Sequence, residues 1–366
     1  MKIAIAGTRG IPNNYGGFEQ CAEFLSVLLA RKGHQVTVYS THYHTYQEKQ
    51  FNGVEIRHCY NPELKIGTPG NFIYDYLCMR DAVKLEYDIL LVLGYTTASV
   101  FYPFMNYGKT VLVTNMDGLE WKRDKWNSVV KKLAKWFEKL GARHSHYLIA
   151  DNIKIQEYLF NTYKREATFI AYGCQPFTDP DETTLEKSSV TKQNYSILVA
   201  RMEAENNIEM ILEGYSRSNQ MGKLLVVGNL TTEYGRNMQS KFGQDARIIF
   251  TGGIYDLKQL NNLRYFSTYY FHGHSVGGTN PSLLEAMASK SFIIAHGNEF
   301  NEAILEEDAF YFTDSTSLAT LLNKPVIDAQ SRTKAIENNF RKVQNIYNWD
   351  LIADQYEELF RKLLKN

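Results

Sequence analysis

The sequence is poor in cysteine and proline and carries no formal net charge. Its 366 residues include four cysteines and eight prolines, and 40 Lys and Arg side chains balance 40 Asp and Glu side chains. Cys21, Cys59, Cys78 and Cys174 show neither a C-x-x-C pair nor another metal-ligand spacing, so we expect no metal site and reduced thiols in a cytoplasmic protein. Neutrality excludes the strong basicity typical of nucleic-acid-binding proteins.

Long hydrophobic runs are also missing. The apolar run at Met1–Gly7 is too short for a signal peptide, and no later run approaches the ~20 residues of a membrane span. We therefore expect a soluble or peripheral protein. The dinucleotide-binding motif G-x-G-x-x-G does not follow the first predicted strand, which argues against a nicotinamide site.

The hydrophobic pattern predicts two α/β domains in tandem. Short apolar runs alternate with helical stretches, an order typical of parallel sheets with helices on both faces. The predicted strands are residues 2–6, 34–40, 54–58, 88–94, 110–114, 147–151 and 167–173, then 195–200, 223–227, 247–250, 269–271 and 291–295. We expect domains at residues 1–175 and 195–345, a polar linker at 176–194, and a C-terminal helix within 346–366 that crosses back to the first domain. A cleft between the domains is the expected ligand site.

A glycine-rich turn at residues 272–282 carries the strongest functional signal. It follows an apolar strand and leads into an apolar helix, so its backbone N–H groups and the positive helix end suit a phosphate. The turn contains Gly278, Thr279, Asn280, Pro281 and Ser282. One turn inside the helix, the Glu285 carboxylate is placed to accept hydrogen bonds from a ribose diol. The alternative is that Glu285 merely pairs with a neighbour on its helix.

Two further loops follow predicted strands of the first domain. Gly16 and Gly17 stand at the entrance of a helix over 18–31, where glycine permits close approach of the backbone to a ligand. Residues 115–120, which include Asp117, follow the strand at 110–114 and therefore lie at the ligand-binding edge of the sheet. Asp117 is alternatively a helix cap.

The first half of the chain is basic, with a formal charge of roughly +5 over residues 1–175. Part of this charge lies on a predicted helix that carries Lys131, Lys132, Lys135 and Trp136. Basic residues mixed with Trp on an amphipathic helix suit an anionic membrane surface. A solvated basic face with its Trp side chains packed inward fits the pattern equally well.

Motifs in both halves resemble known glycosyltransferases. The second half resembles the C-terminal domain of the retaining glycosyltransferases of family 4, through residues 199–201, 207–208, 225–228, 249–252 and 281–288. The first half is similar to a narrower bacterial branch that includes rhamnosyltransferases, through residues 7–12, 15–19 and 115–123. The resemblance covers nearly the whole chain.

This resemblance implies the GT-B fold, in which two doubly wound Rossmann-like domains face each other across a cleft. It also implies a nucleotide-diphosphate-sugar donor, retention at the anomeric carbon, and no metal or other cofactor. Glu285 would then bind the ribose, Asn280–Ser282 the phosphate, and Arg201 the departing diphosphate. The remaining roles would fall to Gly16, Gly17 and Arg9 on the donor side, and to Asp117, Glu120 and Arg123 on the acceptor side.

Two positions depart from the family pattern. Asn206 stands where the family usually has Lys, and Gly277 stands where it usually has Glu. His272, His274 or Arg9 would replace the missing groups. The plainer alternatives are structural histidines, a surface ion pair for Arg201, and an ion pair between Glu120 and Arg123.

The sequence thus predicts a retaining hexosyltransferase. We expect it to transfer L-rhamnose from a dTDP donor to a polyprenyl-diphosphate-linked glycan, at the inner face of the plasma membrane, during bacterial surface polysaccharide synthesis. Because of Asn206 and Gly277, a catalytically silent binding partner of an assembly complex is an alternative. A nucleotide-sugar epimerase of the same fold is another.

Overall fold

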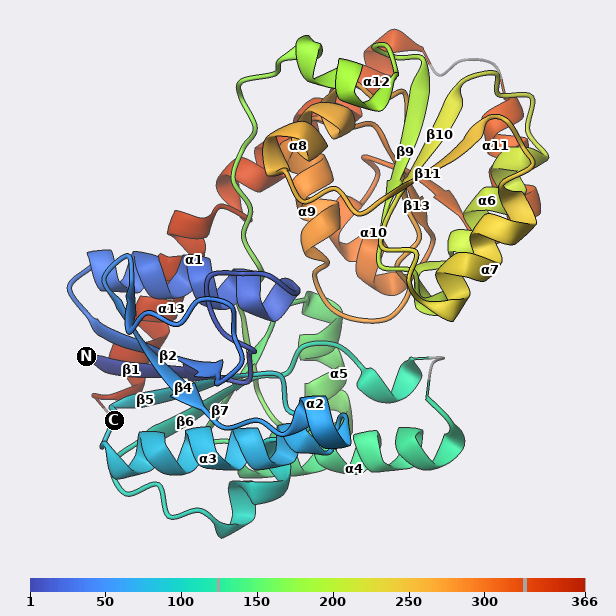
Figure 1. Ribbon diagram of the computed structural model, residues 1–366. Coiled ribbons are helices and arrows are strands. Elements are labelled where there is room, and N and C mark those ends of the chain that lie inside the picture. Colours follow the sequence, from blue (N-terminus) through green and yellow to red (C-terminus); the bar gives the residue numbers. More distant parts are fainter. Residues whose placement is uncertain (124–125, 325–327, 366) are drawn as a thin grey trace. The chain divides into compact units, whose positions relative to one another are not determined.

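A computed structural model describes residues 1–123, 126–324 and 328–365. The chain divides into two compact units, which are coloured mainly blue to green and green to red in Figure 1. The first unit contains residues 1–122, 126–172 and 349–366, and the second contains residues 123–125 and 173–348. The stretch expected as a linker, 176–194, therefore belongs to the second unit, whereas the C-terminal helix belongs to the first.

The first unit is built on an eight-stranded sheet of order β3-β4-β2-β1-β5-β6-β7-β8. Its strands are β1 (Lys2–Ala6), β2 (Gln35–Thr41), β3 (Gln50–Phe51), β4 (Val54–Cys59), β5 (Ile89–Leu93), β6 (Val111–Asn115), β7 (Tyr147–Ala150) and β8 (Thr168–Phe169). The β3–β4 pair is antiparallel, and the other described pairs are parallel. Residues 167–173 were expected as a full strand, but β8 has only two residues.

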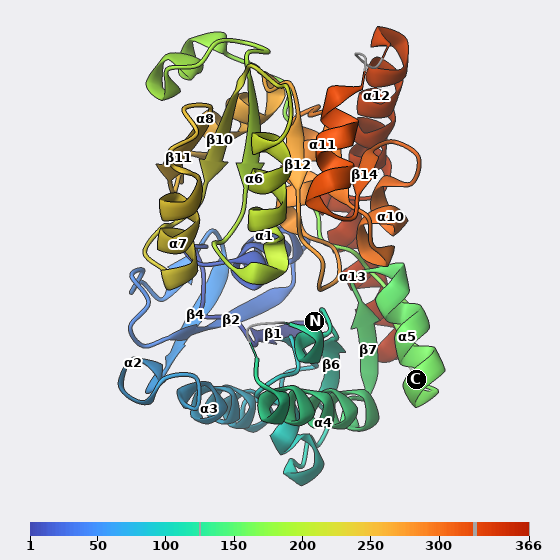
Figure 2. The ribbon, with the colours of Figure 1, turned by 90° about the vertical axis from the view of Figure 1, so that its right-hand side faces the viewer.

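Helices cover both faces of this sheet (Figures 1 and 2). The α-helices are α1 (Gly17–Arg31), α2 (Glu63–Ile66), α3 (Gly70–Lys84), α4 (Ser128–His144), α5 (Ile153–Tyr163) and α13 (Trp349–Leu363). Two short 3-10 helices, η1 (Ser99–Phe104) and η2 (Glu120–Lys122), complete the unit. The indole of Trp349 stacks on the ring of Phe24 at 5.1 Å between centroids, which holds α13 against α1.

The second unit repeats this plan with a six-stranded, wholly parallel sheet of order β11-β10-β9-β12-β13-β14. Its strands are β9 (Tyr195–Val199), β10 (Lys223–Val227), β11 (Ile248–Gly252), β12 (Tyr270–His272), β13 (Ile293–His296) and β14 (Phe310–Phe312). Its helices are η3 (Glu182–Ser188), η4 (Ala204–Asn206), α6 (Ile208–Ser216), α7 (Glu233–Phe242), α8 (Leu257–Tyr265), α9 (Pro281–Ala288), α10 (Glu299–Leu305), α11 (Ser315–Asn323) and α12 (Ala329–Asn345). Leu198, Leu224, Phe271 and Ile294 from four neighbouring strands are fully or almost fully buried in its core.

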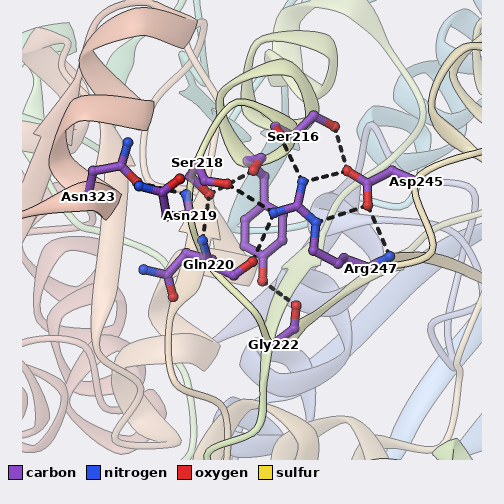
Figure 3. Close-up of polar contacts among 9 residues, drawn as sticks. Ser216, Ser218, Asn219, Gln220, Gly222, Asp245, Arg247 and Asn323 are labelled. Atoms are coloured by element: carbon purple, nitrogen blue, oxygen red, sulfur yellow. Dashed lines mark hydrogen bonds and ion pairs between the residues drawn. The ribbon is translucent and has the colours of Figure 1, made fainter.

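Arg247 joins the start of β11 to the end of α6, as Figure 3 shows. Its guanidinium donates to the carbonyls of Ser216 at 2.8 Å, Ser218 at 3.0 Å and Gln220 at 2.8 Å. Asp245 holds the guanidinium in place, and this bond lowers the pKa of the Asp245 carboxyl to about 2. Because helix C-termini leave carbonyls without intrahelical partners, we infer a structural role for Arg247.

Candidate active site

The glycine-rich turn of the second unit leads into a capped helix. Asn280 is the N-cap of α9, and its side-chain oxygen accepts from the backbone N–H of Ser282 at 2.9 Å. Pro281 occupies the first helical turn, where its missing N–H costs no hydrogen bond. The Ser282 hydroxyl lies 2.6 Å from the hydroxyl of Tyr270 on β12. These contacts fix the start of α9 against the end of the neighbouring strand.

Glu285 is held by a buried arginine that the sequence did not indicate. Nη2 of Arg264, on α8, donates to Oε2 of Glu285 at 2.6 Å. The Arg264 side chain is 1% exposed and that of Glu285 is 20% exposed, so the carboxylate lies between a buried cation and the surface. The expected alternative, a partner on the same helix, is thus replaced by a partner on another helix. An orienting Arg of this kind is compatible with a ribose-binding carboxylate.

The loop after β12 is fastened to η4. A Cβ atom on Gly273 would lie 2.0 Å from the carbonyl oxygen of Asn206, so only glycine permits this approach. The Asn207 amide donates to the Gly273 carbonyl at 2.8 Å. In the same loop, the backbone N–H of Ser275 donates to the Glu205 carbonyl at 3.1 Å. The contacts bring together two segments about 70 residues apart in sequence.

Asn206, which replaces the family's Lys, links two other candidate residues. Its side chain is buried, and Nδ2 donates to the carbonyl of Arg201 at 2.8 Å. Its Oδ1 lies 2.9 Å from Nδ1 of His274. The amide supplies both a donor and an acceptor, which an ammonium group cannot do. Asn206 therefore positions the loop that carries Arg201 relative to the His274 ring.

Gly277, which replaces the family's Glu, has a backbone conformation that disfavours a side chain. Its φ angle is +132°, and an added Cβ atom would lie 3.1 Å from Nε2 of His274. A glutamate here would be strained in this loop conformation. The loop conformation therefore disfavours a side chain at position 277 and places the His274 ring next to this position.

His272 is buried, His274 is partly buried, and both rings are neutral. Burial, with a smaller contribution from His296, lowers the pKa of His272 to about 3. The pKa of His274 lies well below its usual value because of burial, followed by the charges of His272, Arg123 and Arg201. Among the described residues, Nε2 of His272 has no hydrogen-bond partner. A neutral imidazole with an unpaired nitrogen can accept from, or donate to, a sugar hydroxyl.

The two candidate arginines of the second unit have different environments. The Arg201 side chain is 54% exposed and its Nη2 lies 3.7 Å from the Glu203 carboxylate. Arg123 belongs to this unit although it follows the first unit's η2 in the chain, and its Nη1 lies 3.3 Å from Oε1 of the fully buried Glu205 side chain. The sequence offered an ion pair between Arg123 and Glu120 as one alternative. The pairing with Glu205 spans 82 positions and carries no local sequence signal.

In the first unit, the loop after β1 is closed by a carboxylate from α1. Oε1 of buried Glu19 accepts from Arg9 N–H at 2.8 Å and from the Thr8 hydroxyl at 3.2 Å. Gly10 has a φ angle of +125°, and its Cβ would lie 2.3 Å from the Ser40 hydroxyl oxygen. Gly16 and Gly17 form the extended N-cap and first residue of α1. Residues 15–19 thus contain both the start of α1 and Glu19, the side chain that holds the loop after β1.

Arg9 points to residues of its own unit. Its guanidinium pairs with Glu63, with Nε 3.2 Å from Oε2, and stacks 3.7 Å from the Tyr15 ring centroid. Burial alone would raise the pKa of the Glu63 carboxyl, but the bond from Arg9 and one from Tyr43 lower it. Arg9 therefore has an ion-pair partner within the first unit.

The segment after β6 carries Asp117 and is tied down by a buried glutamate on α4. The Glu138 side chain is 1% exposed and accepts from Trp121 Nε1 at 2.9 Å and from the Tyr158 and Tyr163 hydroxyls, each at 2.6 Å. The Tyr95 hydroxyl lies 3.4 Å from the same carboxylate and accepts from the Glu120 backbone N–H at 3.3 Å. Asp117 and Glu120 are both partly exposed. Glu138 thus anchors residues 118–121, which include Glu120 and directly follow Asp117.

The partly exposed Lys135 contacts the cluster around Glu138. Its Nζ lies 2.9 Å from Oε1 of Glu138 and 4.2 Å from the Trp121 ring centroid. The Lys135 side chain is nevertheless 37% exposed, and its contact with a membrane stays a prediction. Lys132 is exposed, whereas Lys131 is partly exposed and has a partner.

Two protein-family models match the chain, one in each half. Residues 1–175 match a domain of unknown function, DUF1972. Residues 181–342 match the model of the glycosyl transferases group 1. No curated protein matches the chain.

Several solved structures share the fold of this chain and cover both of its units. Sucrose-phosphate synthase from Thermosynechococcus elongatus is similar at a TM-score of 0.80 and 16% identity, covering 99% of each chain. Anabaena Alr3699/HepE, in complex with UDP, is similar at 0.75 and 16%, covering 99% of this chain and 100% of that chain. A glycosyltransferase from Rickettsia africae has a TM-score of 0.73 and 16% identity, with 100% and 99% covered. The fold is GT-B, as the sequence predicted.

The second unit contains most of the predicted donor residues. Arg201, His272, His274 and the α9 start at 280–282 with Glu285 lie at the carboxyl ends of β9 and β12, where parallel sheets bind ligands. Asp117, Glu120, Arg9, Gly16 and Gly17 lie in the first unit. Sequence reasoning missed Arg264, Glu205 and Glu138, because each acts through partners distant in sequence. Within the described residues, no group of three or more His, Cys, Asp or Glu side chains could hold a metal ion.

Proposed function

We propose that the protein transfers a hexosyl or deoxyhexosyl group from a nucleoside diphosphate sugar to a glycan acceptor, with retention at the anomeric carbon and without a metal ion. The observation that carries the proposal is the pairing of Glu285 with Arg264 one turn after the Asn280-capped start of α9. A positive helix end and a fixed carboxylate, one turn apart, complement a phosphate and its ribose. That Anabaena HepE binds UDP and UDP-glucose supports this class of donor.

We assign the leaving diphosphate to Arg201 and the start of α9. In a front-side displacement, the bond from the anomeric carbon to the diphosphate oxygen breaks while the acceptor hydroxyl bonds to the same face. The departing diphosphate takes the acceptor proton. The Arg201 guanidinium stabilises the developing charge through paired N–H groups, and the neutral His272 ring contacts a sugar hydroxyl.

We propose L-rhamnose from dTDP-rhamnose as the transferred group and a polyprenyl-diphosphate-linked glycan at the cytoplasmic face as the acceptor. This choice follows from the likeness of residues 7–19 and 115–123 to the bacterial rhamnosyltransferase branch. Asp117 and Glu120 are the acceptor-side carboxylates. Surface polysaccharide synthesis is the corresponding process.

The test is transfer from a panel of nucleotide sugars by wild type and by Arg201→Ala. We expect one donor to be consumed and the variant to be slower by about 100-fold or more, because a transition-state cation is lost. The Arg201 side chain is half exposed, so the free energy of unfolding should change by less than about 0.5 kcal/mol. A variant that folds normally and keeps the wild-type rate would contradict the assignment.

A catalytically silent binding partner is the second candidate. It is favoured by Asn206, whose amide forms a loop contact, and by Gly277, which has no side chain; neither residue supplies charge. Donor hydrolysis without acceptor would exclude it. A nucleotide-sugar epimerase would instead change the sugar with no acceptor present.

A further inference from the structure

The helices on one face of the first unit present an unusual outer surface. In Figures 1 and 2, α3 and α4 lie side by side beneath the sheet. Ring contacts join the elements: Phe72 of α3 to Phe137 of α4 at 5.6 Å between centroids, and Tyr76 of α3 to Phe101 of η1 at 5.1 Å. We call the outer side of α3, η1 and α4 the helical face.

Large apolar side chains on this face are exposed to solvent. On α4 they follow the helical repeat at positions 129, 133 and 136, which places them in one stripe. On α3 and η1 they come from positions 73, 76 and 104. The exposed fractions are Val129 64%, Leu133 46%, Trp136 49%, Ile73 44%, Tyr76 39% and Phe104 84%. Single exposed apolar residues need no explanation, but a set gathered on three adjoining elements is typical of an interaction surface.

Basic side chains accompany the apolar stripes. Lys132, Lys139 and Arg143 are exposed on α4 at a spacing that keeps them beside Trp136. Arg80 and Lys84 are exposed on α3, and they continue the stripe of Ile73 and Tyr76 at intervals of three and four residues. Among the described residues, these five cations have no carboxylate partner.

The carboxylates of the same elements are turned away from the surface. The sequences of α3, η1 and α4 contain three acidic residues. Asp75 is buried and accepts from the Thr97 hydroxyl, Asp81 pairs with Arg57 at 2.7 Å, and Glu138 is the buried acceptor of the Trp121 cluster. The helical face therefore carries positive charge with no exposed carboxylate from its own helices to compensate it.

We propose that the helical face binds the surface of an anionic lipid bilayer. Half-exposed Trp, Leu and Val beside Lys and Arg match an interface in which apolar groups enter the acyl boundary and cations meet lipid phosphates. This extends the sequence-based expectation from α4 to two helices and η1. None of the helices that the structure describes is long and apolar enough to cross a bilayer. Contact of this kind would give the enzyme access to a lipid-linked acceptor, although it does not depend on the proposed transfer.

The experiment is cosedimentation of the full chain with phosphatidylcholine vesicles, with and without phosphatidylglycerol. We expect binding only to the anionic vesicles, weakened by salt. The variant Lys132→Gln/Lys139→Gln/Arg143→Gln should lower the partition coefficient by roughly a hundredfold, and Leu133→Ser/Trp136→Ser by about tenfold. Matched controls change exposed residues of the second unit, Lys187→Gln/Lys334→Gln and Met221→Ser, and should bind like wild type.

Four results would overturn the proposal. One is the absence of binding to anionic vesicles by folded wild type, and another is equal binding to neutral vesicles. The third is unchanged binding by both face variants with melting midpoints like wild type. If sedimentation shows that wild type self-associates and the face variants do not, the face binds a second copy instead of lipid. Since no nucleotide enters the assay, its failure would leave the transfer proposal standing, and failure of donor binding would leave this one standing.

Discussion

Substituting a residue type expected in the family does not by itself remove a site, because Asn206 and Gly277 each have a structural explanation. The Asn206 amide joins Arg201 to His274 through one donated and one accepted hydrogen bond. Gly277 has a positive φ that a glutamate would find strained. A donor site built with neutral histidines in place of Lys and Glu is chemically coherent. It should hold the sugar through hydroxyl hydrogen bonds that do not titrate between pH 5 and 9, because the pKa values of both histidines are strongly lowered.

A buried carboxyl, that of Asp75, has a pKa that is shifted upward, whereas the pKa values of the two histidines are lowered. Burial raises the pKa of Asp75 to about 7, from 3.8 in an exposed chain. The folded state therefore holds its proton more tightly than the unfolded state. The free energy of unfolding should therefore be highest below pH 4 and should fall as the pH rises from 4 to about 7. Above pH 7 Asp75 causes no further change.

Asp75→Asn should remove this penalty while keeping the acceptor for the Thr97 hydroxyl. We expect the variant and wild type to have similar free energies of unfolding near pH 4. At pH 8 the variant should be more stable by roughly 2–4 kcal/mol. Denaturant unfolding at the two pH values measures the difference. An equal difference at both values would show that Asp75 does not titrate with a raised pKa.

At the scale of elements, the strongest local patterns were predictable. The strand and helix that flank the glycine-rich turn, β12 and α9, follow from an apolar run, a capping Asn and a Pro at the first turn. The hydrophobic pattern did not predict α10, β14 or α11, because these elements have three to nine residues and weak periodicity. The helix expected within 346–366 corresponds to α13, and Ile346–Asn348 separate it from α12.

Contacts between elements could not be predicted. Arg264 and Glu285 belong to different helices, and Glu138 gathers donors from β5's loop, η2 and α5. A buried arginine and a buried glutamate are visible in a sequence only as charges at helical positions. Their partners depend on how the helices pack, which the hydrophobic pattern leaves open.

Glu138→Gln tests the anchor of residues 118–121. The amide nitrogen cannot accept from Trp121 or a tyrosine, and Lys135 loses its counter-charge, so we expect a loss of roughly 2–4 kcal/mol of stability. Hydrogen exchange of the backbone at residues 118–121 should become faster. Lys139→Gln, an exposed change on the same helix, is the control and should alter neither quantity. An unchanged exchange rate in Glu138→Gln would mean that the segment is held by other contacts.

At the scale of the whole molecule, the repeated plan of the two units was accessible from sequence because parallel strands leave continuous apolar runs. The unit to which each segment belongs was harder to predict from the sequence. Residues 176–194 form part of the second unit, and Arg123 joins that unit through Glu205. The fold alone does not define the reaction, since GT-B proteins serve different chemistries. The function therefore depends on whether α9 and Glu285 form a donor site.

That question is answered most directly by titrating UDP, dTDP and GDP, without metal, into wild type and Glu285→Gln. Gln keeps an acceptor for Arg264, whereas Ala would leave a buried cation unpaired and confuse binding with folding. Glu213→Gln, which changes an exposed carboxylate paired with Arg217 on α6, is the matched control. We predict that one diphosphate binds wild type and the control equally and Glu285→Gln at least about tenfold more weakly. Binding of no diphosphate by folded wild type, or equal binding by Glu285→Gln, would contradict the donor site.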